Sequence, residues 1–208
     1  MKPAPFRYAR PQHLADAVGL LAAYHDVKIL AGGQSLVPML NLRLVRPAVL
    51  IDLNGVPGLD HITPRATGGP SSGALVRHAA LADSAPVIER APLLAEAARH
   101  IGHAAIRHRG TLGGSLAHGD PTAELPAARV ALDAELVLHV PRGTRTIQAP
   151  GFLGIATSIE PAGTNLASYE LLTGRRTMSG SAEAAMVRME PDGHMRGGVA
   201  QLDRSVAG

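Results

Sequence analysis

Two pairs of adjacent glycines, each followed closely by a serine, are the residues of this chain best suited to chemistry. The first lies in Ala31-Gly32-Gly33-Gln34-Ser35. Glycines adopt positive φ angles and let a ligand approach the main chain closely, and successive N–H groups in such a turn can hold an anion. The Ser35 hydroxyl and the positive end of a helix beginning near Val37 would add to this, so the segment suits a diphosphate. Taken alone it favours a plain tight turn, because it matches neither G-x-G-x-x-G nor G-x-x-x-x-G-K-[ST].

The second pair lies in residues 109–126, RGTLGGSLAHGDPTAELP, which we predict to be a loop. The hydroxyls of Thr111 and Ser115 flank its glycines. One interpretation is structural, with Asp120 or Thr122 capping the helix that follows. The other is that amides and hydroxyls hold one part of a cofactor while a carboxylate accepts from a ribose or ribityl hydroxyl. Two anion-suited loops roughly 80 residues apart favour a long phosphate-bearing ligand held from two sides.

Three histidines, His100, His103 and His108, form a loose cluster in the sequence. Metal binding requires convergent nitrogens supported by further hydrogen bonds. We predict that Gly102 ends a helix between the first two histidines. Surface or hydrogen-bonded histidines are therefore favoured, and no metal site is predicted.

No catalytic acid, base or nucleophile is predicted either. Asp120 and Glu124 are four residues apart across a proline, and capping or a cofactor hydrogen bond explains them more simply. Ser115 with His118 has no identifiable acid to orient the histidine, and the chain contains no G-x-S-x-G motif.

The elements that must position the glycine pairs follow from hydrophobic spacing and breaker residues. In the first third we predict a helix at 11–26, a strand at 27–31, the glycine loop at 31–35, a second helix at 37–44 and a second strand at 48–54. Residues 63–73 read as a loop or weak hairpin. Beyond them we predict a strand entering a polar turn at 73–84, an amphipathic helix at 91–102 and the second loop at 109–126. Two hairpins follow at 134–149 and 183–203, the second with a Pro-Asp-Gly turn.

The composition excludes several classes of function. The 208 residues are 46% hydrophobic, only 2% are aromatic, and the net charge is +3 with no run of five or six like charges. These values argue against a nucleic-acid platform, which needs aromatic faces or a basic patch. Without cysteine, the chain itself provides no disulfide, zinc-thiolate or iron–sulfur ligand. Because we find no signal peptide and no membrane span, we expect a cytoplasmic location.

Two long motifs, residues 28–54 (KILAGGQSLVPMLNLRLVRPAVLIDLN) and 97–127 (AARHIGHAAIRHRGTLGGSLAHGDPTAELPA), resemble the FAD-binding medium subunit of the molybdenum hydroxylase family. That family includes the medium subunit of bacterial carbon monoxide dehydrogenase and the flavin domain of xanthine dehydrogenase. Residues 1–24 are similar to the family's N-terminus. The resemblance covers roughly residues 1–160, with both motifs in the expected order and separation.

The resemblance implies an α+β fold of the vanillyl-alcohol-oxidase type (PCMH type), with FAD between two α/β subdomains. These would span residues 1–58 and 59–165, followed by a shortened remnant of the family's C-terminal domain at 166–208. Residues 167–174 and the hairpin near the end resemble parts of that region, while the segment normally between them is missing. Residues 61–75 depart from the alternating strand usual at that position.

The resemblance also implies the cofactor-binding residues. One set would surround the FAD diphosphate: Ala31, Gly32, Gly33, Gln34 and Ser35. A second set would bind it from the other subdomain: Thr111, Gly113, Gly114 and Ser115. Glu124 matches an acidic position that helps to hold the cofactor. The remaining positions lie within the motifs: Lys28, Leu36, Ile106, His118 and Asp120.

As implied by the resemblance, the chain is an FAD-carrying electron-transfer subunit of an oxidoreductase complex. A molybdopterin large subunit would oxidise the substrate, an iron–sulfur small subunit would pass on the electrons, and an external acceptor would reoxidise the flavin. The missing cysteines agree with this division, because the clusters must lie on another chain. Two alternatives stay open: a stand-alone flavin oxidase, and a non-catalytic remnant that docks partner subunits.

Overall fold

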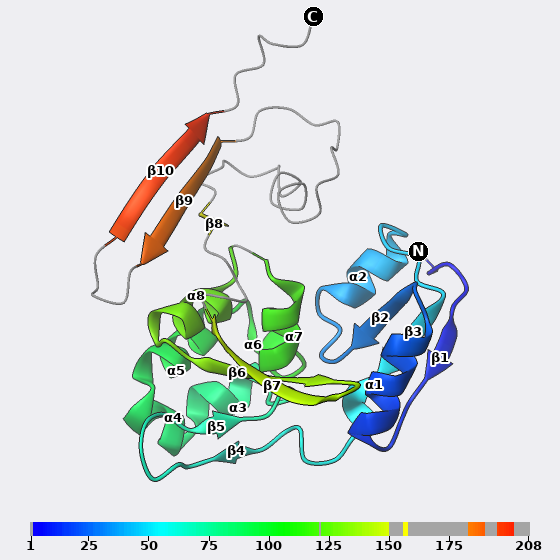
Figure 1. Ribbon diagram of the computed structural model, residues 1–208, viewed down its shortest axis with the longest axis horizontal. Coiled ribbons are helices and arrows are strands. Elements are labelled where there is room, and N and C mark those ends of the chain that lie inside the picture. The colour runs from blue at the N-terminus through cyan, green and yellow to red at the C-terminus, as the bar shows by residue number, and fades with distance from the viewer. Residues whose placement is uncertain (1, 121, 150–155, 158–182, 190–194, 202–208) are drawn as a thin grey trace, which may run out of the picture. The chain divides into compact units, whose positions relative to one another are not determined.

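The computed structural model describes residues 2–120, 122–149, 156–157, 183–189 and 195–201 (Figure 1). The chain folds as two compact units, Met1–Phe152 and Leu153–Gly208. Both glycine motifs belong to the first unit. No helix in the described part of the chain is long and apolar enough to span a bilayer.

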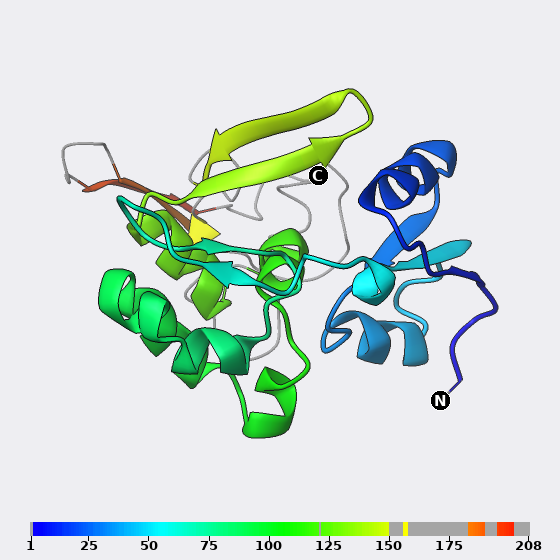
Figure 2. The same ribbon diagram turned by 90° about the horizontal axis from the view of Figure 1, so that it is seen from below.

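The first unit opens with a small parallel sheet in the strand order β1-β3-β2. Its strands are β1 (Arg7–Ala9), β2 (Val27–Leu30) and β3 (Val49–Asp52), joined through helices α1 (Leu14–Ala23) and α2 (Leu36–Asn41). Figure 2 shows the two helices on opposite sides of the sheet. This follows from the strand order, because the connections β1–β2 and β2–β3 run in opposite directions and parallel crossovers are right-handed.

The buried strand β3 holds this part together. Val49, Leu50 and Ile51 are at most 3% exposed, as expected for a central parallel strand covered on both faces. Ala17 from α1 packs against Val49 and Ile51, and Leu20 and Leu53 lie at the edge of this core. The register pairs Leu30 with Asp52. The carboxyl ends of β2 and β3 therefore lie side by side, and the chain that leaves each strand emerges at one edge.

The rest of the first unit is mainly helical. After the 3-10 turn η1 (Leu53–Gly55) and the short antiparallel pair β4 (Ile62–Thr63) and β5 (Ser71–Ser72), six helices follow: α3 (His78–Asp83), α4 (Ala85–Arg90), α5 (Pro92–His100), α6 (Ala104–Arg107), α7 (Leu112–His118) and α8 (Glu124–Ala131). Their core contains fully buried side chains of Leu81, Val87, Leu94 and Leu125.

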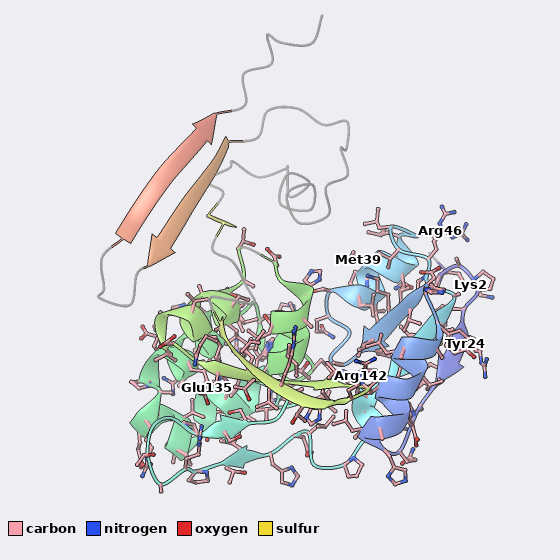
Figure 3. All side chains as sticks on the ribbon, in the orientation of Figure 1. Lys2, Tyr24, Met39, Arg46, Glu135 and Arg142 are labelled. Atoms are coloured by element: carbon pink, nitrogen blue, oxygen red, sulfur yellow. The ribbon has the colours of Figure 1, made fainter. Side chains whose placement is uncertain are left out.

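An antiparallel hairpin of β6 (Glu135–Val140) and β7 (Gly143–Gln148) closes the described part of this unit. Figure 3 marks its two ends, with Glu135 where β6 begins and Arg142 at the turn. In the second unit, β8 (Ala156–Thr157), β9 (Glu183–Met189) and β10 (Met195–Gln201) form an antiparallel sheet in the order β10-β9-β8.

Most of the predicted elements are confirmed. They are the helices at α1, α2 and α5, the strands at β2 and β3, the weak hairpin of β4 and β5, and the hairpins β6–β7 and β9–β10. The Pro-Asp-Gly turn at 191–193, the stretch 167–174 and the boundary at 165/166 lie outside the described residues. The mixture of helices and strands agrees with the predicted α+β class.

Two predicted elements are wrong. Residues 73–84 form a turn and helix α3, not a strand. The buried residues His78, Leu81 and Ala82 follow helical spacing, which the short apolar run before them obscured.

Within the second glycine segment, residues 112–118 form helix α7 instead of a loop. Leu112 and Leu116 lie one turn apart and are buried, so tertiary packing outweighs the low helix propensity of the two glycines between them.

Candidate functional site

The first glycine segment, residues 31–35, leaves the carboxyl end of β2 and enters α2. Gly33 has φ +73°, a conformation that side-chain-bearing residues rarely adopt. Its carbonyl accepts the Val37 amide at 3.0 Å and so closes the turn that starts α2. Positive φ at this point is what reverses the chain from strand to helix. The glycine pair therefore does form the tight turn that the sequence favours.

The same turn contains a row of amides that have no acceptor in the described part of the chain. Among the described residues, the backbone N–H groups of residues 32–36 donate to no protein acceptor, and the Ser35 side chain makes no capping hydrogen bond. Gln34 and Ser35 are exposed. Unpaired amides that follow one another through a turn with a left-handed residue form an anion-binding concavity. The donor set is neutral, and it suits phosphate oxygens.

The second glycine segment is built differently. Thr111 is 2% exposed and caps α7, its hydroxyl accepting the Gly114 amide at 3.2 Å. The amide of Gly113 donates to the Ala74 carbonyl at 2.8 Å. A Cβ on Gly113 would lie 2.6 Å from the Ala74 Cβ. The glycines here therefore permit close helix packing. Separately, the Thr111 amide has no protein acceptor among the described residues.

The two glycine segments lie against each other. A Cβ on Gly32 would lie 2.4 Å from the Arg109 carbonyl oxygen and 2.8 Å from the Gly110 Cα. A Cβ on Gly114 would lie 3.6 Å from the Ala31 Cβ. The first segment and the start of the second thus pack main chain to main chain, so one ligand can contact both.

Two polar side chains join these segments. The Asn54 side-chain amide donates to the Ala31 carbonyl at 2.9 Å, and its oxygen accepts from Arg77 Nη2 at 2.8 Å. Arg77 Nη1 donates to the Arg109 carbonyl at 2.6 Å. The fork of the guanidinium thereby spans Asn54 and the chain preceding Thr111. We call Asn54 and Arg77 the bracket.

Asp52 supports the bracket from the end of β3. Its carboxylate accepts from the Asn54 amide and side chain at 2.9 and 2.6 Å and from the Tyr8 hydroxyl. Burial by itself would raise the pKa of Asp52. The hydrogen bonds from Tyr8 and Asn54, with the nearby Arg10 charge, outweigh it and hold the pKa below its ordinary value. Asp52 is therefore a charged acceptor that fixes the orientation of Asn54.

His78 lies behind the second segment. The residue is 6% exposed, and its ring packs so closely on Gly110 that a Cβ there would lie 2.7 Å from Nδ1. Neither ring nitrogen has a hydrogen-bond partner among the described residues. Burial lowers the pKa of His78, opposed by the neighbouring Thr111 backbone and the Glu124 charge. The ring is therefore neutral at pH 7 and acts as packing for the segment.

The structure brings together only part of the predicted site. Ala31, Gly32, Thr111 and Gly114 lie at the contact between the two segments. Gly33, Gln34, Ser35 and Leu36 continue the free row of amides. Gly113 and Ser115 are half-buried in the first turn of α7, and Ile106 accepts the Gly110 amide at 2.7 Å from α6.

The other predicted residues lie farther along their elements. Lys28 is exposed on β2, His118 is exposed at the end of α7, and Glu124 is exposed at the start of α8. Asp120 accepts from the Thr122 amide and hydroxyl at 2.9 and 2.7 Å. The N-cap of α8 is Ala123, without a side-chain cap, so the interpretation in which Asp120 or Thr122 caps this helix is wrong.

Sequence reasoning missed Asn54, Arg77 and His78. Asn54 looked like the end of a strand before a turn, and Arg77 looked like a strand residue. Their partners lie 23 and 32 positions away in the chain, so only the fold reveals the contacts. The one available signal was that parallel strands β2 and β3 must end at the same edge, which places Asn54 beside the first glycine segment.

Comparisons with known proteins identify the family to which this chain is similar. Residues 4–173, which include both glycine segments, match the family described as the FAD binding domain in molybdopterin dehydrogenase. The nicotine 6-hydroxylase medium subunit of Paenarthrobacter nicotinovorans is 43% identical over 176 residues, which are 83% of this chain and 59% of that protein. The carbon monoxide dehydrogenase medium chain of Hydrogenophaga pseudoflava is 42% identical over 154 residues, which are 73% of this chain and 53% of that protein.

A solved structure is similar over most of the chain. Quinoline 2-oxidoreductase from Pseudomonas putida 86 superposes with a TM-score of 0.71 at 32% identity, covering 91% of this chain and 71% of that one. The chain spans between half and three-fifths of the length of the two curated relatives named above.

Proposed function

Because this chain belongs to the family of FAD binding domains in molybdopterin dehydrogenases, we propose that it is the FAD-carrying electron-transfer subunit of a molybdenum hydroxylase complex. FAD is the cofactor that the family description names. The relatives are medium subunits or chains of a nicotine hydroxylase and a carbon monoxide dehydrogenase. We propose that an iron–sulfur subunit donates the electrons and that a molybdopterin subunit oxidises the substrate. We also propose the predicted cytoplasmic location.

One observation carries the proposal: within the described ranges, the amides of residues 32–36 form a row without a protein acceptor. A diphosphate needs several donors on one surface, and this turn provides them without a charged side chain. In the proposed site these amides and the Ser35 hydroxyl hold the diphosphate, and the free Thr111 amide adds a donor from the second segment. The close contact of Gly32 with Arg109 and Gly110 supports a ligand shared by both segments.

The protein's part in the proposed function is binding and positioning. When bound, FAD supplies the redox chemistry, taking electrons from one centre and delivering them to another. The residues of this chain hold the phosphates and fix the cofactor between two segments. None of them needs to act as an acid, base or nucleophile. The predicted subdomains 1–58 and 59–165 and the PCMH-type arrangement belong to this proposal, because the two segments lie on either side of residue 58.

Purification from the native host tests the proposal. We expect the chain to co-purify with an iron–sulfur protein and a large molybdopterin protein, identified by mass spectrometry. We also expect stoichiometric FAD with the flavin absorbance at about 450 nm. A yellow chain that purifies alone would contradict the assembly and favour a stand-alone flavoprotein. A colourless chain that takes up no added FAD would contradict the cofactor assignment.

A further inference from the structure

We propose that the bracket, Asn54 with Arg77, positions both glycine segments for the cofactor by pinning one carbonyl of each. The inference rests on the proposed function, because it concerns how the same site binds FAD. Neither residue was predicted as a cofactor ligand, and neither needs to touch FAD. They act through the direction of the peptide groups that they hold.

A hydrogen bond to the C=O of a peptide group also sets the direction of its N–H. A trans peptide is planar, and its C=O and N–H point in opposite directions. The Ala31 carbonyl is held by the Asn54 amide at 2.9 Å, so the Gly32 N–H points away from Asn54. The Gln34 side chain holds the Gly32 carbonyl at 3.3 Å, which directs the Gly33 N–H in the same manner. The start of the amide row is thus aimed by side chains, since a glycine pair would otherwise rotate freely.

The second half of the bracket sets the distance between the segments. Arg77 donates to Asn54 Oδ1 at 2.8 Å and to the Arg109 carbonyl at 2.6 Å. The neighbouring backbone is fixed too, because the His78 amide donates to the Gly110 carbonyl at 3.1 Å and the Leu112 amide to the Val76 carbonyl at 2.9 Å. Arg77 therefore belongs to the second segment's framework and reaches across to the first.

A lysine could not replace Arg77 in the bracket. A guanidinium presents several donors in a planar fork, whereas a lysine is a single point charge on a flexible stem. Asn54 has a matching constraint: it must donate to Ala31 and to Asp52 while it accepts from Arg77. An aspartate at this position could still accept from Arg77. It would repel the Ala31 carbonyl and the Asp52 carboxylate.

Three variants test the bracket: Arg77→Gln, Asn54→Asp and, as a matched control, Arg99→Gln. Arg99 also donates to a main-chain carbonyl, that of Ala82, at 2.7 Å, but this hydrogen bond joins α5 to α3 and includes no residue of either segment. The affinity for added FAD is measured by flavin fluorescence titration, and stability by thermal unfolding of the FAD-free chain. We expect Arg77→Gln and Asn54→Asp each to weaken FAD binding roughly ten- to hundredfold, as for loss of a charged or buried hydrogen bond.

The control separates positioning from general destabilisation. We expect Arg99→Gln to lower the unfolding temperature, because the Ala82 carbonyl loses its donor, while leaving the affinity for FAD within about twofold. The losses of affinity in Arg77→Gln and Asn54→Asp should also be non-additive in the double variant, because both remove the same link. FAD affinities equal to that of the unchanged chain, or losses that only follow the fall in unfolding temperature, would overturn the proposal.

A readout without FAD keeps the bracket and the proposed function distinguishable. In ¹H–¹⁵N spectra of the FAD-free chain, Arg77→Gln should shift the amide signals of Gly32 and Gly33, and Arg99→Gln should not. If the unchanged chain binds no FAD but these shifts occur, the proposed function fails and the bracket stands. If FAD binds and the Gly32 and Gly33 signals do not respond to Arg77→Gln, the bracket fails and the proposed function stands.

Discussion

Replacing Gly32 by alanine tests how closely the two glycine segments approach each other. The new Cβ would lie 2.4 Å from the Arg109 carbonyl oxygen and 2.8 Å from the Gly110 Cα, where ordinary van der Waals separations begin at 3.4 Å. Both obstacles are main-chain atoms, so no side chain can rotate away. The segments must separate by about 1 Å, which is the kind of overpacking that destabilises a core by about 1–3 kcal/mol.

The separation also breaks the bracket. Arg77 reaches Asn54 Oδ1 across the two segments at 2.8 Å, and a shift of about 1 Å takes this hydrogen bond beyond its useful range. We expect a total loss of about 2–4 kcal/mol of unfolding free energy. For a chain of this size that corresponds to a fall of roughly 4 to 16 °C in the unfolding temperature.

The assay is thermal unfolding of the FAD-free chain followed by circular dichroism. Gly19→Ala is the matched control, because a Cβ at Gly19 meets nothing within 4 Å and the residue lies inside α1. Alanine there should stabilise the chain by about 0.5–1 kcal/mol. If Gly32→Ala unfolds at the same temperature as the unchanged chain, the segments do not pack main chain to main chain and the site as described is wrong.

Two predictions concern pH. The pKa of Asp52 is below its unfolded value of about 3.9, so its contribution to stability is complete well above that pH and is lost as the pH falls through the unfolded and then the folded pKa. Tyr8→Phe removes one of the groups that lower this pKa, so the variant should be less stable at pH 6 and lose less stability between about pH 5 and pH 3. Urea unfolding at several pH values measures the free energy of unfolding. A pH profile parallel to that of the unchanged chain would count against the Tyr8–Asp52 contact. The pKa of His78 is also lowered, so stability is complete above its unfolded pKa of about 6.5 and falls as the pH drops through that value toward the folded pKa. In His78→Gln the unfolding free energy should fall less between about pH 7.5 and pH 5.5 than in the unchanged chain, and an equal fall in both would show that this ring does not titrate as a buried group.

Much of the first glycine segment and its setting could be predicted from the sequence. The apolar runs of β2 and β3 and the spacing of α1 indicate the parallel sheet, and Gly32-Gly33 indicates the turn between strand and helix. These signals are local, since each depends on a few neighbouring residues. The resemblance of the two motifs adds the family, which the comparisons confirm.

The second segment shows where local reasoning fails. Two glycines inside residues 112–118 argue against a helix, yet Leu112 and Leu116 bury one face and Gly113 packs on Ala74. That packing partner is distant in the sequence. The same holds for the bracket, because no local pattern relates Asn54 to Ala31 or Arg77 to Arg109. Such contacts follow from the tertiary fold, which sets which main-chain carbonyls need a donor.

The proposed function depends most on the amides of residues 32–36, which we propose hold the diphosphate of FAD. Gly33→Asp and Gly33→Asn test it directly, because aspartate and asparagine adopt positive φ more often than other side-chain-bearing residues do. The Cβ of either would lie 3.0 Å from Val37 Cγ2, so both variants share this strain and differ mainly in charge. At about 5 Å and an effective dielectric constant of about 20, one carboxylate and one phosphate charge repel by about 3 kcal/mol, or roughly a hundredfold in affinity.

The measurement is a titration of each variant with FAD and with riboflavin, which has no phosphate. We predict that Gly33→Asp binds FAD roughly a hundredfold more weakly than Gly33→Asn, and that the two variants bind riboflavin equally. Equal affinities of the two variants for FAD would contradict the claim, because a carboxylate could not then lie beside the diphosphate without repelling it.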